Sequence, residues 1–255
     1  QLLAAGHAAR HKLAEEQPAS EKNGPFDFKN AGKMLGWAPV VEGDVLPRHP
    51  FDPDAPDISA EVPLLVGTNL HEFVCGVDHP DAYDMTMAQL EEQISEFYGE
   101  KTKAIIQAYQ RNCPQAQPFD LFSFVFAASV RQCAVEQAEL KALQGKSSAY
   151  YYLFSWRTPV LDGRPGAFHS VEIPFVFDNL ARCTNLTGGD PAAEILAAQV
   201  SQAWINFART GNPNHAGLPY WPAYTPGEGQ TMIFDTPCSV IQDPDREGRR
   251  IVLGL

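Results

Sequence analysis

Hydrophobic residues in this chain fall into short continuous runs, separated by longer stretches in which they recur every three or four positions. Two of the runs, residues 62–66 (VPLLV) and 150–156 (YYYLFSW), are almost wholly apolar. Runs of this length and composition are typical of strands that are buried on both faces of a parallel sheet. A third run, residues 231–235 (TMIFD), is expected to form the last strand of the sheet.

The stretches with helical spacing carry start and stop signals. Thr86 and Gln89 form the pattern of a capping box, and the helix that they begin is expected to end at Gly99. Asp190 can cap a further helix, which Gly211 terminates. Helices are therefore expected after Thr86 and over residues 1–16, 101–109, 119–143 and 191–209.

The alternation of strands with helices, without an internal repeat, predicts an α/β fold in which helices flank a mostly parallel sheet. A length of 255 residues is sufficient for one large domain with a sizeable core. The first expected helix, over residues 1–16, has no capping residue before Leu2. This favours a chain that starts inside a fold.

The composition is that of a folded globular protein and excludes two classes of partner. Hydrophobic residues make up 44% of the chain and charged residues 20%. The net charge of −12 would repel nucleic acids and anionic membrane surfaces at long range. The longest strongly apolar stretch, residues 121–130, is about half as long as a bilayer span requires. We therefore expect no nucleic-acid partner and no membrane span.

Cysteine and aspartate residues give no sign of a disulfide framework or of a metal site. The five cysteines are odd in number and irregularly spaced, without a CxxC pair. Asp52, Asp54 and Asp57 lie in a proline-rich stretch that lacks the glycine and the final glutamate of a calcium-binding loop. We interpret these aspartates as turn formers on a surface loop, and we expect neither a metal nor a cofactor.

Candidate chemistry lies on the loops that follow the two buried strands. Glu72 comes after the first strand and His169 after the second, and parallel α/β sheets carry their active residues on such loops. In a catalytic triad a histidine takes the proton of a nucleophile, while a carboxylate holds the other ring nitrogen. Seven histidines and 31 acidic residues make such coincidences common, so the spacing alone is a weak signal.

Five motifs in a fixed order make the pairing more specific. Over about residues 2–242 they resemble the second half of the type-B carboxylesterases, the α/β-hydrolase group that includes bacterial para-nitrobenzyl esterases and the cholinesterases. The motifs are PVVEGDVLP, VPLLVGTNLHEF, GAFHSVEIPFVFDNL, WINFARTGNPN and WPAYT.

The resemblance implies an α/β-hydrolase fold and hydrolysis of a small-molecule carboxylic ester by a serine esterase that needs no cofactor. It assigns the acid of the triad to Glu72, in the pattern G-T-x-x-x-E. It assigns the base to His169, in the pattern H-x-x-E-[IL]-x-F-V-F. The order Ser…Glu…His is also that of α/β-hydrolases.

The motif of the nucleophile is absent from the sequence. α/β-Hydrolases place the serine in G-x-S-x-G, upstream of the acid, with an HGGG-type oxyanion loop earlier still. The serines before Glu72 are Ser20 and Ser59, and neither stands between glycines. A nearest mimic at residues 145–149 (GKSSA) is interpreted as a loop from helix to strand. We therefore predict that residues 1–255 are the C-terminal part of one α/β-hydrolase domain, whose partner is an N-terminal half carrying the serine and the oxyanion hole.

Residues around the proposed pair have secondary expectations. His71 is expected to be structural, and Glu172 either supports the site or anchors its loop. Most of Phe168, Phe175 and Phe177 should lie in the core, which leaves one to line the acyl or alcohol pocket. Phe73 stands where many members of the family have glycine, which puts the turn after the acid in doubt.

Two alternatives to an esterase remain open from the sequence. The first is a cholinesterase-like domain that has lost catalysis and serves binding or adhesion. The presence of both Glu72 and His169 counts against it, because such relatives usually lack the serine or the histidine. The second alternative is a fragment that has no activity of its own.

Overall fold

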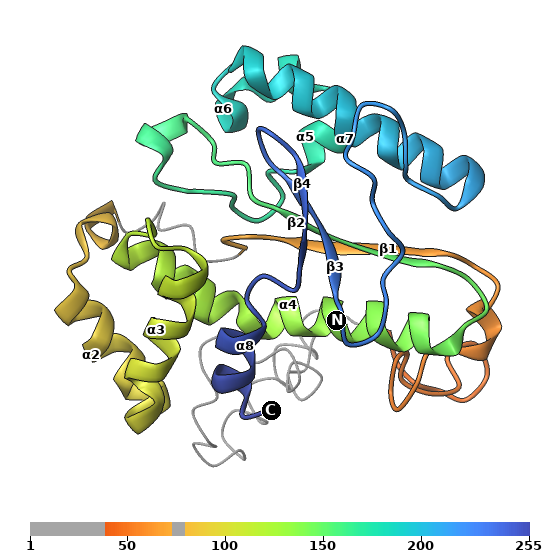
Figure 1. Ribbon diagram of the computed structural model, residues 1–255, viewed down its shortest axis with the longest axis horizontal. Helices are drawn as coiled ribbons and strands as arrows, with labels where there is room; N and C mark the ends of the chain where they lie inside the picture. Colours follow the sequence, from red (N-terminus) through yellow and green to blue (C-terminus); the bar gives the residue numbers. More distant parts are fainter. Residues whose placement is uncertain (1–38, 73–79) are drawn as a thin grey trace, which may run out of the picture.

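In a computed structural model of the chain, residues 39–72 and 80–255 are described (Figure 1). The helix expected over residues 1–16 and the turn at Phe73 lie outside these residues.

A four-stranded sheet forms the centre of the molecule (Figure 1). Its strands lie side by side in chain order, and the first three are parallel while the fourth is antiparallel to the third. The strands are β1 (Leu64–Asn69), β2 (Ala149–Phe154), β3 (Gln230–Phe234) and β4 (Ser239–Gln242). The mostly parallel sheet is as predicted, but the expectation that residues 231–235 form the last strand is wrong, because β4 follows.

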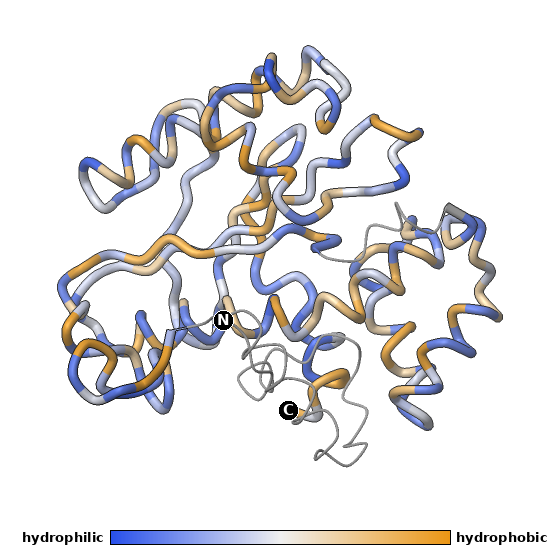
Figure 2. Tube along the Cα trace, turned by 180° about the vertical axis from the view of Figure 1, so that it is seen from behind, coloured by the Kyte–Doolittle hydropathy of each residue, from blue (hydrophilic) through white to orange (hydrophobic). Residues whose placement is uncertain are grey.

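Helices cover both faces of the sheet, which is why its inner strand β2 is apolar on both sides. Helix α4 (Pro118–Gln144) lies along one face and α7 (Pro191–Thr210) along the other (Figure 1). Side chains of β2 alternate between the two, as strand geometry requires. Tyr150 belongs to the core beneath α7, whereas Tyr151 packs with residues of α4. Orange, hydrophobic segments therefore run through the middle of the molecule in Figure 2.

A second group of helices packs beside the first half of α4 and has its own apolar core. It comprises α2 (Met87–Tyr98), α3 (Thr102–Asn112) and α8 (Arg246–Leu253). Thr86 and Gln89 form the predicted capping box, and Gly99 follows the last residue of α2. None of the helices in residues 39–72 and 80–255 has both the length and the apolar character that a membrane span requires.

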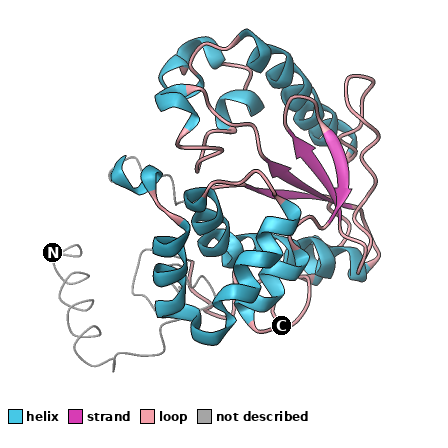
Figure 3. Cartoon of the chain, turned by 60° about the vertical axis from the view of Figure 1, so that its left-hand side comes forward, coloured by secondary structure: helices cyan, strands magenta, loops and turns pink. Residues whose placement is uncertain are grey.

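Short helices occupy the connections (Figure 3). They are α5 (Ile173–Val176), α6 (Thr184–Thr187), η2 (Asp57–Ser59), η3 (Pro80–Asp84), η4 (Gly99–Lys101), η5 (Val160–Gly163) and η6 (Leu180–Arg182). Residues 145–148 form the predicted loop between α4 and β2, and Gly145 ends α4 in the left-handed conformation.

Candidate active site

The loops that follow β1 and β2 remain paired beyond the sheet. The main chain of His71 donates to the carbonyl of Ala167 at 3.1 Å, and that of His169 donates to the carbonyl of Glu72 at 2.7 Å. Glu72 and Phe168 thereby form a parallel bridge. Since β1 and β2 are parallel neighbours, their carboxyl ends meet at one edge, and this bridge brings the two predicted residues together.

Glu72 and His169 are in direct contact. The Nδ1 atom of His169 lies 2.7 Å from Oε2 of Glu72. The other carboxylate oxygen of Glu72, Oε1, accepts the main-chain N–H of Asn69 at 2.7 Å. The side chain of Glu72 is 8% exposed and that of His169 is 52% exposed. A buried carboxylate with both oxygens engaged therefore holds a histidine ring that reaches solvent.

The contact with Glu72 determines which ring nitrogen of His169 is available to accept a proton. With Glu72 ionised, Nδ1 of His169 carries the proton and donates it to the carboxylate. The nitrogen that can take a proton from a nucleophile is then Nε2. The carboxylate would stabilise the imidazolium that forms.

The main chain has a positive φ at two residues of this site. Glu72 has a φ of 31° and Ser170 a φ of 72°, although neither residue is glycine. Such conformations cost free energy and are kept where the surrounding contacts determine them. They are enriched at functional sites, and here they occur at Glu72 itself and at the residue after His169.

Asn69, the last residue of β1, supports the loop that carries the base. Its Nδ2 donates to the carbonyl of Phe168 at 2.8 Å and to Oε2 of Glu172 at 2.5 Å. Glu172 thus anchors this loop through Asn69. Asn69 therefore contacts Glu72 through its main chain, and through its side chain it contacts the loop that carries His169.

His71 lies beside the acid, with its ring turned toward α4. Its Nε2 is 3.0 Å from Oδ1 of Asp120, and its Nδ1 accepts the main-chain N–H of Ala167 at 2.9 Å. Asp120 also accepts from Arg157 at 2.7 Å. Burial lowers the pKa of His71 and outweighs the opposing effect of Asp120. Burial opposes ionisation of Asp120, but the hydrogen bonds from His71 and Arg157 outweigh it and lower its pKa.

The three phenylalanines near His169 differ in how deeply they are buried. Phe175 is fully buried in the core beneath α7, and Phe168 packs against the same core. Phe177 is 72% exposed, so it is the member of the three that the core does not take up.

Sequence reasoning missed three residues that support the pair: Asn69, Asp120 and Arg157. Asn69 stands inside the G-T-x-x-x-E pattern, at a position that the pattern leaves open. Asp120 occupies the first turn of α4, where its carboxylate accepts the main-chain N–H of Gln117 and resembles an ordinary helix cap. Their contacts with the site join residues that are distant in sequence, and a single sequence gives no signal for such contacts.

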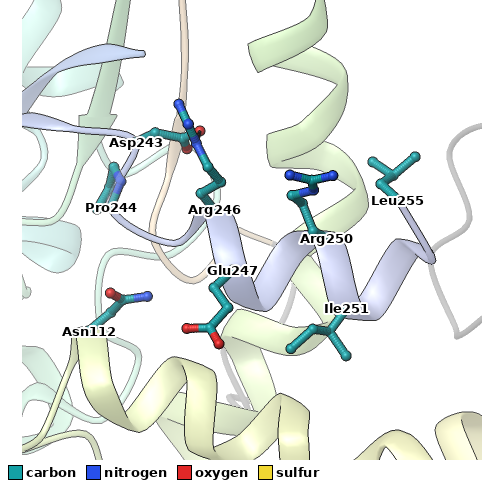
Figure 4. Close-up of a pocket in the computed structure, with 8 residues that line it drawn as sticks. All are labelled: Asn112, Asp243, Pro244, Arg246, Glu247, Arg250, Ile251 and Leu255. Carbon is teal, nitrogen blue, oxygen red and sulfur yellow. Dashed lines mark hydrogen bonds and ion pairs between the residues drawn. The ribbon is translucent and has the colours of Figure 1, made fainter. Parts of the chain in front are cut away.

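A surface cavity of about 540 Å³ lies away from this pair, along α8 (Figure 4). It is lined by Asn112, Asp243, Pro244, Arg246, Glu247, Arg250, Ile251 and Leu255. Arg246 already pairs with Asp243 at 2.7 Å. The described part of the chain holds no group of three or more His, Cys, Asp or Glu side chains arranged to bind a metal ion.

Comparison with protein families matches residues 9–249 to the model of the carboxylesterase family. The curated relatives include the para-nitrobenzyl esterase of Bacillus subtilis, 27% identical over 244 residues, which are 94% of this chain and 46% of the relative. They also include the phenmedipham hydrolase of Pseudarthrobacter oxydans, 27% identical over 78% of this chain and 40% of the relative. The chain therefore spans less than half the length of either relative.

Solved structures give the same result. The carboxylesterase of Geobacillus stearothermophilus is 31% identical, with a TM-score of 0.62 over 86% of this chain and 46% of that structure. An esterase of anaerobic Clostridium hathewayi that hydrolyses aliphatic aromatic polyesters is 25% identical. Its TM-score is 0.66 over 89% of this chain and 44% of the esterase.

Proposed function

Because the chain belongs to the carboxylesterase family, we propose that it supplies the acid and the base of a serine esterase, Glu72 and His169 respectively. The observation that carries this proposal is the 2.7 Å contact between Nδ1 of His169 and Oε2 of Glu72, with the carboxylate buried and the ring half exposed. The relatives are ester hydrolases by name, which agrees with this assignment.

The nucleophile of the proposed reaction is a serine from a segment outside these 255 residues. The sequence has no G-x-S-x-G, and its relatives are about twice as long as the matched region. In the first step the serine attacks the ester carbonyl while Nε2 of His169 accepts its proton. Glu72 keeps the ring in place and stabilises its positive charge. The same outside segment would supply the N–H donors that hold the oxyanion.

The imidazolium then protonates the leaving alcohol, and water releases the acid from the acyl-enzyme with His169 again acting as the base. These steps require no metal or cofactor. The proposed substrates are small carboxylic esters, and the net charge of −12 disfavours esters that carry negative charge.

Substitutions in the full-length product of the gene test the assignment. His169→Ala removes the base and Glu72→Gln keeps the shape of the acid without its charge. We expect each to lower kcat for p-nitrophenyl butyrate by about 10³- to 10⁴-fold. His215→Asn is the matched control, since His215 bonds to Gln199 and Gly217 and takes no part in the pair.

A His169→Ala enzyme that hydrolyses the ester at the unsubstituted rate would refute the proposal. A well-folded full-length protein without any esterase activity would favour the binding or adhesion alternative instead.

A further inference from the structure

His71 joins three segments that meet at the site. Its main-chain N–H and its ring Nδ1 both bond to Ala167, two residues before His169. Its carbonyl accepts from Ser123 of α4 at 3.0 Å, and its Nε2 faces Asp120 of the same helix at 3.0 Å. The side chain is 1% exposed. The residue next to the acid is thus fixed both to the long helix and to the base loop.

The two ring contacts require a neutral imidazole with its proton on Nε2. Nδ1 accepts an N–H from Ala167, so it carries no proton, while Nε2–H donates to Asp120. A proton on Nδ1 would set two N–H groups against each other and break the contact with Ala167. Arg157 pairs with Asp120 from the other side and keeps the carboxylate ionised.

We propose that His71 is a positioning residue of the esterase: its neutral ring ties Ala167 to Asp120 and so sets the place of His169 relative to Glu72. The proposal rests on the proposed function, because it assumes that Glu72 and His169 are the catalytic pair. It goes beyond that function by assigning a role to a buried histidine, and through it to Asp120 and Arg157, outside the pair itself.

The packing leaves room for this ring and no more. Gly166 stands over it, and a Cβ at Gly166 would lie 2.4 Å from ring atoms of His71. The ring of Phe124 lies on another side, with centroids 5.3 Å apart. The ring therefore cannot turn away from Ala167 without moving its neighbours.

The positioning role makes the pair sensitive to acid. Charged groups near the His71 ring are Asp120 and Arg131 on α4 and Arg157 after β2. The next residue in the chain is Glu72, which contacts His169. Asp120 favours a proton on His71, whereas burial and the two arginines oppose it. When protonation does occur, the bond to Ala167 is lost, and the enzyme loses activity in addition to the loss caused by protonation of His169.

Two substitutions in the full-length product separate the contacts of His71. His71→Ala removes both ring contacts. His71→Asn places a carbonyl oxygen near the position of Nδ1 and can still accept from Ala167, although it cannot reach Asp120. For p-nitrophenyl butyrate at pH 8 we expect kcat to fall about 10- to 100-fold in His71→Ala, with KM nearly unchanged, because a small misplacement of the base costs this much. We expect His71→Asn to recover most of kcat.

The pH profile provides a readout that a purely structural role would not change. We expect kcat/KM of the unsubstituted enzyme to fall more steeply below pH 6.5 than that of His71→Asn, which has one titrating group fewer. His215→Asn should keep the unsubstituted profile. Equal acid limbs in the unsubstituted enzyme and His71→Asn, or equal kcat losses in His71→Ala and His71→Asn, would overturn the proposal. If His71→Ala does not fold, the comparison of pH profiles still decides.

His169→Ala, assayed in parallel, distinguishes the two levels of failure. If it is inactive while His71→Ala is as fast as the unsubstituted enzyme, the positioning role alone is wrong. If His169→Ala is fully active, the proposed function is wrong, and the positioning role fails with it.

Discussion

At the scale of residues, two neighbours fix the positions of Glu72 and of the loop that carries His169. Asn69 donates its main-chain N–H to the carboxylate of Glu72 and its side-chain N–H to the loop of His169. His71 bonds that same loop to α4 through Ala167 and Asp120. The 2.7 Å contact between Glu72 and His169 therefore depends on neighbours outside the pair.

The stability of the fold should decrease in acid because of His71 and Asp120. Burial lowers the pKa of His71 in the folded state, so the unfolded chain takes up the proton first as pH falls. Its contribution is fully present above its ordinary pKa of 6.5 and is lost below it. The lowered pKa of Asp120 acts in the same direction, from its ordinary 3.8 downward.

We therefore expect the free energy of unfolding to fall between pH 7 and pH 5, by up to about 1.4 kcal/mol for each pH unit below 6.5 as long as His71 takes up a proton only in the unfolded chain. Denaturant titrations at pH 7 and pH 5 measure this free energy for the full-length unsubstituted protein, for His71→Asn and for the control His215→Asn. The decrease should be smaller in His71→Asn, and three parallel curves would contradict the assignment.

Gly166→Ala should be more destabilising than its backbone conformation alone requires. Gly166 and Gly189 have φ values of 64° and 69°, so alanine at either position carries the cost of a left-handed conformation, about 1–2 kcal/mol. A Cβ at Gly189 meets nothing within 4 Å, whereas one at Gly166 meets the His71 ring. Thermal or denaturant unfolding should show an extra loss of about 1–3 kcal/mol in Gly166→Ala. Equal losses of unfolding free energy in Gly166→Ala and Gly189→Ala would show that the His71 ring can move aside without cost.

At the scale of elements, buried ion pairs fasten α8 to α4. Arg131 of α4 contacts Asp245 at 2.9 Å, and Arg249 of α8 contacts both Asp245 and Asp243. Arg131 also donates to the carbonyl of Leu70 at 3.4 Å. The network thus runs from the C-terminal helix to the turn that carries the acid.

Arg249→Met tests this connection. The side chain of Arg249 is 2% exposed, and its loss removes one cationic partner from each of two aspartates. Asp245 keeps Arg131 and Asp243 keeps Arg246, so we expect a cost of about 1–3 kcal/mol of unfolding free energy. Arg250→Met is the control, since Arg250 is exposed on the same helix. If the two substitutions cost the same, as measured by denaturant unfolding, α8 does not depend on the network.

Elements with strong patterns were predictable, and those that depend on distant contacts were not. The start of α7 at Pro191 after the Asp190 cap follows from local signals alone. The apolar run at residues 62–66 marks the start of β1 too early and its end too early, because the pattern stops where the apolar residues stop. Gly67 lies within β1 (Leu64–Asn69), where a Cβ would meet the ring of Tyr152 at 2.4 Å.

Strand β4 could not be predicted, because it is short and mostly exposed. It has four residues, Ser239–Gln242, mostly exposed, and it is paired with β3 rather than buried between helices. Two apolar residues, Val240 and Ile241, between two polar ones form too short a pattern to indicate a strand until its neighbour is known. The candidate site was predictable as far as Glu72 and His169, because their loops follow strong strand signals and family motifs. Its supports are tertiary contacts and needed the structure.

At the scale of the whole molecule, β1 lies at the edge of the sheet in the described part of the chain. The family and its α/β-hydrolase fold, both expected from the five motifs, are confirmed by the matched family model and by the solved structures.

In the proposed enzyme a further segment completes the domain beyond the edge strand β1. Unpaired main-chain groups of an edge strand invite aggregation when they stay uncovered.

We accordingly expect the 255 residues expressed alone to bind a hydrophobic dye or to aggregate, as judged by dye fluorescence and light scattering. The control is the same chain expressed together with the segment encoded upstream in its gene. A monodisperse product that melts cooperatively on its own would contradict this expectation.

The central claim is that these residues supply the acid and the base of an esterase whose nucleophile lies outside them. The most direct measurement is hydrolysis of p-nitrophenyl acetate and butyrate by the chain alone and by the chain joined to its upstream segment. We predict no hydrolysis above background by the chain alone, and activity in the joined protein that His169→Ala abolishes. Hydrolysis by the chain alone would contradict the claim, because the nucleophile would then be one of these 255 residues.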